Sequence, residues 1–157
     1  MKLTAILAAA CLAAPLAADN AKPTSPKGGM TEQDKRFLES VRTMYLGTDK
    51  ENKIIAKDIV WHVPGHNPVS GLYQGYEAYT KTMPGKMGPL SKWEFKVGNV
   101  MVNGEHVVAT VHFIGERKGR KVDMDGAHIM RLNAQGQIAE GWGFAADQDA
   151  LDAFFAD

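Results

Sequence analysis

His128 interrupts an otherwise apolar series of side chains between Gly119 and Phe144. The stretch is typical of two strands joined by a turn at 133–136. Side chains alternate along a strand, so one face carries Val122, Met124, Gly126, His128, Met130 and Leu132. An imidazole, with a pKa near 6.5, can donate or accept a proton near neutral pH. His128 is therefore a candidate catalytic residue that would polarise a carbonyl or move a proton. The alternative is a core histidine, hydrogen-bonded to Tyr45 or to a backbone carbonyl.

A ligand held beside His128 would need an apolar surround. The residues expected to supply it are Tyr45, Trp61, Val63, His66, Val111, Phe113, Met124, Met130 and Trp142. The sequence leaves the role of two of them ambiguous. Trp61 fits core packing and recognition equally well. Trp142 fits either face of its strand, and an outward Trp142 would suit a dimer interface.

Other polar motifs give weaker signals. His62 and His66 are four residues apart, but the Pro-Gly pair between them prevents a helix and no third ligand has a suitable spacing, so we expect no metal site. Asp123 and Asp125 resemble part of a calcium loop, yet they lie on a predicted strand and the later ligands are missing. We interpret them as a solvated face, and we expect no cofactor.

Residues 1–18 have the pattern of a secretory signal peptide, with Lys2, an apolar run and small residues before the expected cleavage site. The apolar run is shorter than the roughly 20 residues of a membrane span. Acylation of Cys11, as in a lipoprotein, is the disfavoured alternative. The sequence thus predicts a periplasmic or secreted protein without a membrane span.

Residues 19–30 are rich in Gly, Pro and Ser and predict a flexible lead-in to one domain over 31–157. Cys11 is the single cysteine, so a chain without its signal peptide has no disulfide. Loss of Lys2 leaves 17 Lys and Arg against 18 Asp and Glu. With no basic patch, nucleic acid is not an expected partner.

Helical signals dominate the first part of the domain. Thr31 can cap a helix whose apolar residues recur at helical spacing as far as Tyr45, with Gly47 positioned to end it. A shorter helix over 48–57 is expected next. Together the two predict a helical hairpin.

A short strand over 59–63 follows, and then a Gly- and Pro-rich loop over 64–75 that carries His66. A helix over 77–83 should stop at the next proline, with a mobile connection over 84–89.

Long strands fill the second half. Strands over 93–102 and 106–116 flank Asn103-Gly104, a strong hairpin signal. Alternation in the second of them separates an apolar face from a face that carries His112, which sends His112 outward. Asp147 can cap a closing helix that buries Leu151, Phe154 and Phe155. Helices followed by antiparallel strands indicate the α+β class.

Three runs of residues, at 58–66, 71–75 and 136–142, resemble the SnoaL-like branch of the nuclear-transport-factor-2-like superfamily. The likeness covers 31–157. It implies a cone-shaped, strongly curved antiparallel sheet wrapped around the N-terminal helices, with a pocket inside and often a homodimer across the outer face.

The resemblance also bears on chemistry. Steroid isomerases of this superfamily place a protonated Asp on the strand before the last turn, and the matching position here is His128. Their general-base Asp falls near Val63, so that mechanism is not expected.

The function that these signals predict is binding of a small hydrophobic molecule inside the cone. It is combined with cofactor-free isomerisation, cyclisation or hydrolysis through His128, or it is binding alone. A partner-binding module is the third alternative, because the outer sheet face is mixed in polarity.

Overall fold

The computed structural model describes residues 29–46 and 53–156. The predicted signal peptide, most of the predicted lead-in, the Gly47 helix stop and the start of the helix expected over 48–57 lie outside these residues.

Six strands form one open, mostly antiparallel sheet in the order β2-β1-β6-β5-β4-β3. Their bounds are β1 Ile55–Val63, β2 Gly71–Gln74, β3 Lys92–Asn103, β4 His106–Arg117, β5 Arg120–Leu132 and β6 Ile138–Ala145. The pairing of β1 with β6 is parallel, and the other four are antiparallel.

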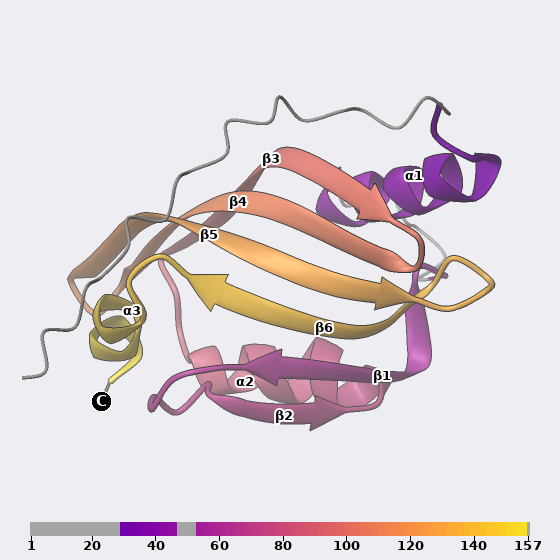
Figure 1. Cartoon of the computed structure of the whole chain (residues 1–157). Coiled ribbons are helices and arrows are strands. Elements are labelled where there is room, and N and C mark those ends of the chain that lie inside the picture. The colour runs from indigo at the N-terminus through magenta and orange to yellow at the C-terminus, as the bar shows by residue number, and fades with distance from the viewer. Residues whose placement is uncertain (1–28, 47–52, 157) are drawn as a thin grey trace, which may run out of the picture.

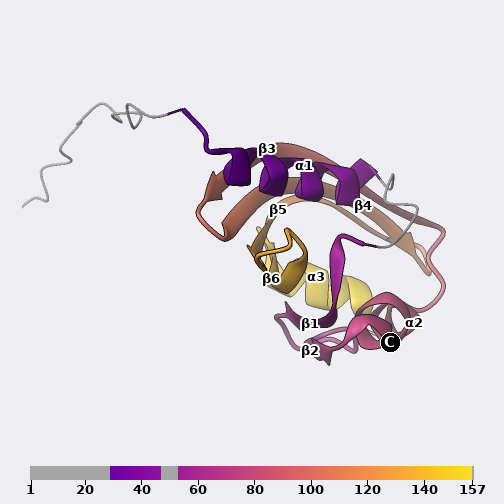
Figure 2. The ribbon, with the colours of Figure 1, turned by 90° about the vertical axis from the view of Figure 1, so that its right-hand side faces the viewer.

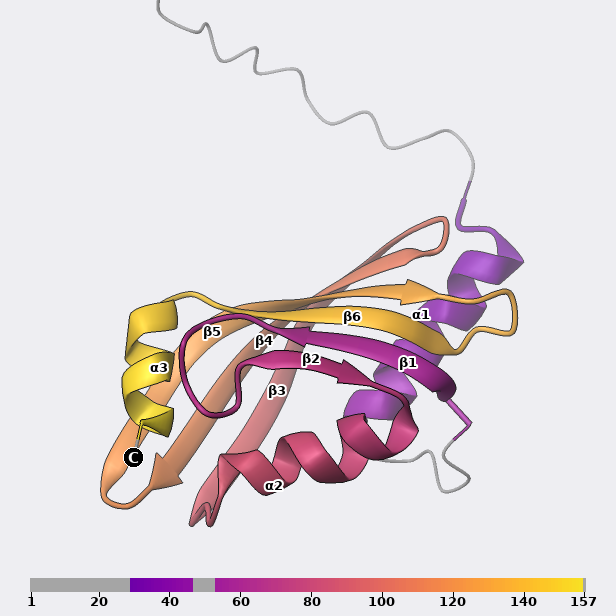
Figure 3. The ribbon, with the colours of Figure 1, turned by 90° about the horizontal axis from the view of Figure 1, so that it is seen from below.

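Helices lie in and around the curl of this sheet. They are α1 Glu32–Leu46, the π-helical turn η1 Ala78–Thr82, α2 Met83–Met87 and α3 Gln148–Phe155. Helix α1 contacts β3 and β4, α3 contacts β5 and β6 at the far end, and α2 continues η1 close to β2 (Figures 1 and 3). Figure 2 shows the sheet curling from β3 and β4 above to β1 and β2 below, with α3 between them. The predicted α+β cone is confirmed.

Both predicted helix caps form. Thr31 Oγ1 accepts the backbone N–H of Asp34 at 3.1 Å, and the Asp34 carboxylate accepts the N–H of Thr31 at 3.0 Å. At α3, Asp147 Oδ1 accepts the N–H of Ala150 at 2.9 Å. Each cap satisfies N–H groups that have no partner within the helix, and this fixes where α1 and α3 begin.

The hairpins follow their turn residues. The predicted hairpin forms, but its two-residue loop is Gly104-Glu105, because Asn103 pairs with His106 at the strand ends, and Gly104 has a φ of +59° at the first loop position. Lys118 and Gly119 both have positive φ, which matches the right-handed twist of β4 and β5. These two turns set the register that fixes which side chains of β3, β4 and β5 face inward.

The helix predicted over 48–57 is wrong from Ile55 onward, where β1 already begins. Ala56 and Ile59 are both buried, and this three-residue spacing mimics a helix. This spacing of buried residues arises because the parallel pairing of β1 with β6 is irregular between Ile55 and Val60. The partner strand lies some 80 residues away, so nothing local signals it.

Two further boundaries differ from the prediction. The loop expected over 64–75 contains the edge strand β2, whose Tyr73 pairs with Trp61 of β1. The helix expected to stop at Pro84 instead continues through it to Met87, so the connection predicted over 84–89 is largely helical. Pro84 is tolerated because it lies in the first turn of α2, where an N–H is not needed.

The strand faces are those that alternation predicts. Val107, Ala109, Val111 and Phe113 of β4 are all buried, whereas His112 points outward and pairs with Asp123 and Asp125 on β5. On β5, His128 faces the interior between the buried Met130 and the half-buried Met124. The inner face therefore supplies both the core and the wall of a cavity.

Candidate ligand-binding site

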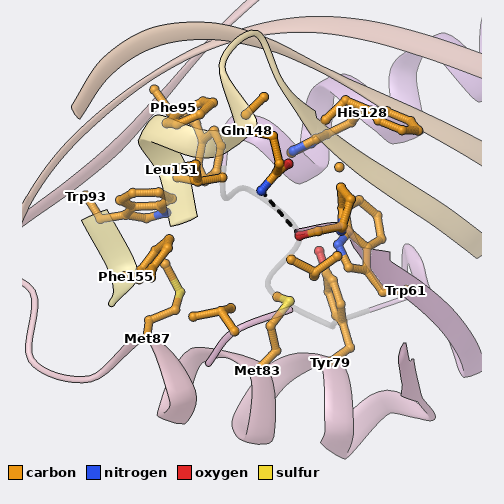
Figure 4. Close-up of a pocket in the computed structure, with 17 residues that line it drawn as sticks. Trp61, Tyr79, Met83, Met87, Trp93, Phe95, His128, Gln148, Leu151 and Phe155 are labelled. Carbon is orange, nitrogen blue, oxygen red and sulfur yellow. Dashed lines mark hydrogen bonds between the residues drawn. The ribbon is translucent and has the colours of Figure 1, made fainter. Parts of the chain in front are cut away.

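A cavity of about 170 Å³ lies inside the curl of the sheet. Its wall is made by β1, η1, α2, β3, β4, β5, β6, α3 and the loop after β1 (Figure 4). The lining side chains are mostly apolar, and the side-chain polar atoms among them belong to Tyr79, His128 and Gln148 and to the ring nitrogens of Trp61 and Trp93. Gln148 already donates to Asp152 at 2.8 Å.

Aromatic rings form one end of the cavity. Trp93 packs against Phe95, Phe113 and Phe155 with ring centroids 5.4–5.7 Å apart. A Cβ on Gly115 would come within 2.7 Å of the Trp93 ring, so the missing side chain at Gly115 makes room for it. Flat rings in contact give a rigid surface suited to a planar apolar ligand.

Trp61 and His128 meet at the other end. Their rings are edge-on, with centroids 5.3 Å apart. Two glycines of β6 lie over them: a Cβ would come within 2.2 Å of Trp61 at Gly141, and 3.5 Å from the His128 ring at Gly143. The Gly-Trp-Gly spacing on β6 therefore turns both glycines inward and Trp142 outward.

His128 is held from behind by α1. Tyr45 Oη lies 2.6 Å from Nδ1 of His128, joining α1 to β5 through one hydrogen bond. Burial lowers the pKa of His128 to about 4, because a charged ring would lose its hydration among these apolar side chains. The ring is therefore neutral at neutral pH.

Both tyrosines near this end stay protonated. Burial raises the pKa of Tyr79 to about 12. The pKa of Tyr45 is raised as well, by burial first and then by the nearby Tyr79. Among the described residues that line the cavity there is no Asp, Glu, Lys or Arg.

The structure brings four of the residues predicted for the site together in the cavity wall: Trp61, Val63, Phe113 and His128. Tyr45 contacts His128 but lies behind it, outside the lining. Val111 and Met130 are buried in the core next to the site, and Met124 is half-buried beside Val111 and Phe113.

His66 and Trp142 lie away from the cavity. His66 is exposed, and its backbone N–H donates to Asp152. Trp142 lies on the outer sheet face and stacks on His62, with centroids 4.9 Å apart and planes 8° from parallel. His62 bonds Glu140 at 3.1 Å, so His62 and His66 do not converge.

Several lining residues escaped the sequence reasoning. They are Pro64, Val69, Tyr79, Met83, Met87, Trp93, Phe95, Gly143, Phe144, Ala145, Gln148, Leu151 and Phe155. Tyr79, Met83 and Met87 recur at a spacing of four, the signal of one helix face, and Pro84 obscured it. Trp93 and Phe95 are two residues apart, which is the spacing of side chains on one face of a strand.

The fold and the site define a cone-shaped α+β domain with an apolar cavity. Comparison with known proteins gives its family. Residues 47–141 match the model of the SnoaL-like domain, so the chain belongs to the SnoaL-like family.

Solved structures show the same fold. A protein of unknown function with a cystatin-like fold, from Xanthomonas campestris, is 27% identical, with a TM-score of 0.67 over 77% of this chain and 98% of its own. A putative SnoaL-like polyketide cyclase from Jannaschia is 16% identical, with a TM-score of 0.66 over 83% and 99%. TerC, crystallised with polyporic acid, is 14% identical, with a TM-score of 0.66 over 76% and 98%. No curated protein matches the sequence.

Proposed function

We propose that the domain binds a small hydrophobic molecule in the cavity, with His128 as its main polar contact. The observation that carries the proposal is an apolar cavity with a single neutral imidazole in its wall. Sites of this kind hold ligands by shape and orient them through a few polar groups. The co-crystal of TerC with polyporic acid supports small-molecule binding in a similar fold.

The volume limits the ligand. An apolar cavity of about 150 Å³ holds one benzene ring, and this cavity measures about 170 Å³. The aromatic wall around Trp93 favours a flat molecule of one or two rings.

Binding is tested with a panel of such molecules, including indane, 1-indanone and 1-naphthol, read through quenching of the fluorescence of Trp61 and Trp93. We expect saturable binding that Gly143→Leu abolishes, because its side chain would enter the cavity beside His128. Ala127→Leu, on the outer face of β5, is the control and should bind normally. Equal affinity in Gly143→Leu and the parent protein, or no binding by any member of the panel, contradicts the proposal.

A second candidate function is cofactor-free isomerisation, cyclisation or hydrolysis through His128. The resemblance to a putative polyketide cyclase favours it. Against it, a group with a pKa of about 4 is a weak base at neutral pH, and the described lining supplies no carboxylate partner. Binding without catalysis is therefore the better-supported function.

The two candidates separate in one variant. If the protein catalyses, His128→Leu removes turnover of a bound substrate while its affinity changes less than about tenfold (1.4 kcal/mol). If product analysis of every ligand that binds the parent protein finds no turnover, the enzymatic candidate fails and binding stands.

We also propose export to the periplasm or the medium, on the evidence of residues 1–18 alone. No helix within the described residues is long and apolar enough to cross a membrane. N-terminal sequencing of the protein recovered from the periplasm should begin near residue 19. An uncleaved N-terminus in the cytoplasm contradicts this proposal.

A homodimer across the outer sheet face is a further proposal. Cross-strand neighbours form one row on that face, running Met101, Val108, Ile129, Trp142, His62 and Leu72. Met101 and Leu72 are 54% and 53% exposed, so the row offers apolar area to a second copy. Sedimentation should show a dimer that Trp142→Glu dissociates. A parent protein that sediments as a monomer contradicts the homodimer and leaves a different partner as the alternative occupant of this face.

A further inference from the structure

The two ring nitrogens of His128 have different surroundings. Nδ1 faces Tyr45, whereas Nε2 faces Gly143, where a Cβ would lie 3.6 Å from it. Within the described chain, Nε2 has no hydrogen-bond partner, and no fully buried side-chain nitrogen or oxygen lacks one. Nε2 is therefore open to the cavity that Gly143 helps to line.

The hydrogen bond between Tyr45 and His128 has two possible directions. In one, the Tyr45 hydroxyl donates to Nδ1, and the ring proton sits on Nε2. In the other, Nδ1 carries the proton and donates to the Tyr45 oxygen, so the hydroxyl proton needs an acceptor elsewhere. The described residues give the Tyr45 hydroxyl no other partner. Leaving a donor without an acceptor away from water is unfavourable, so the first direction is favoured.

The charge states of the pair agree with this choice. Burial raises the pKa of the Tyr45 phenol and lowers that of His128, so each group keeps one proton at neutral pH. A protonated phenol next to a neutral ring donates, because the ring nitrogen is the stronger acceptor. Trp61 and Phe95 contact the same ring and limit its rotation.

We infer that Tyr45 is a positioning residue that holds His128 with its proton on Nε2, and that the cavity therefore selects ligands with an acceptor oxygen. This inference rests on the proposed ligand binding. The ligand class is a flat, mostly apolar ketone, quinone or ester whose carbonyl oxygen accepts the Nε2 proton. A neutral N–H fixed in an apolar wall also stabilises negative charge that develops on such an oxygen.

The tautomer can be measured directly, without any ligand. In the ¹⁵N-histidine-labelled full chain, two-bond ¹H–¹⁵N correlations at pH 7 should show His128 with a protonated Nε2 and a hydrogen-bonded, unprotonated Nδ1. His128→Gln assigns the signal among the five histidines. Tyr45→Phe should move the Nδ1 shift to the value of a free acceptor.

Tyr73→Phe is the matched control for that measurement. It removes another buried hydroxyl, which donates to the carbonyl of Val69, and it should leave the His128 shifts unchanged. A proton found on Nδ1 in the parent protein overturns the inference, and so does an Nδ1 shift that Tyr45→Phe leaves unmoved.

The selectivity is tested with 1-indanone and indane, which differ by one carbonyl. The ratio of their dissociation constants cancels the shared burial of the rings. We expect His128→Leu to raise the dissociation constant of 1-indanone, relative to that of indane, about fivefold to tenfold, because the ketone loses one hydrogen bond. Tyr45→Phe should raise the ratio by a smaller factor, and Tyr73→Phe should not change it.

The outcomes separate the two proposals. If neither compound binds and the rest of the panel fails as well, the binding function fails, while the NMR result still decides the tautomer. If both compounds bind and the ratio is the same in the parent protein and His128→Leu, binding stands and the selectivity is refuted.

Discussion

His128 and His112 lie on neighbouring strands and on opposite faces of one sheet, and their surroundings drive their protonation in opposite directions. Burial against aromatic rings lowers the pKa of His128 to about 4. Hydrogen bonding to Asp125, and then the charge of the nearby Asp123 and Asp125, raises the pKa of the solvent-exposed His112. The comparison shows that the sheet separates an interior that excludes charge from an exterior that carries charge in pairs.

The largest expected effect of this difference is on the pH dependence of the free energy of unfolding. His128 binds a proton more readily when unfolded, so its neutral native state stabilises the fold above pH 6.5 and loses that contribution as the pH falls toward 4. The full contribution is about 3 kcal/mol. Urea unfolding at pH 7 and pH 4.5 should show this loss in the parent protein and a much smaller one in His128→Gln. An equal loss in both would place the acid sensitivity elsewhere.

A second prediction concerns the glycines that turn toward the interior. Gly141→Ala should destabilise the protein by about 2 kcal/mol, because the new Cβ would lie 2.2 Å from the Trp61 ring. Gly143→Ala, two residues along the same face, meets His128 at an ordinary 3.5 Å and should cost much less. Thermal unfolding of the two variants tests this. If both are equally destabilised, general strand propensity rather than the packing of Trp61 is the cause.

The inner face was predictable to the extent that alternation decides it. Parity along the strands placed His128, Phe113 and Val111 inward and His112 outward, and the structure agrees. The predictions that failed are those that depend on pairing with a distant strand or on irregular geometry. The bulged start of β1 resembled a helix because its partner strand is remote in sequence.

The cavity wall was harder to predict for the same reason. A wall is the sum of short contributions from many elements, and residues such as Met83 and Leu151 reach it only after the sheet curls. The sequence leaves Trp142 on either face of β6, and in the structure Gly141 lies over Trp61, which turns Trp142 outward. The alternation of side chains along β6 shows only which residues share a face with Trp142. The packing shows which of the two faces is the inner one.

The third prediction addresses the coupling of α1 to the site. Removing one partner of the Tyr45 and His128 hydrogen bond leaves the other unsatisfied, so Tyr45→Phe and His128→Leu should each be destabilising. The double variant leaves no unsatisfied group and should be more stable than the sum of the single changes implies, by about 1 kcal/mol. A double-mutant cycle in urea measures this. Strict additivity would mean that the bond seen in the structure contributes no coupling.

The smallest expected effect is on the outer face, and its sign is opposite to that of His128. Because the pKa of His112 is raised in the folded protein, its charge interaction is fully present below pH 6.5 and is lost as the pH rises through the folded value. Exposed pairs are screened by water and salt, so the change in unfolding midpoint between pH 6 and pH 8 should be slight. Because the contribution of His128 also changes in this pH range, with the opposite sign, the change is measured in His128→Gln. In that background it should disappear when His112→Gln is added and in 1 M salt. A pH 6 to 8 change that survives in the double variant would show that the two Asp residues of β5 do not act through His112, and the contrast between the faces would then rest on His128 alone.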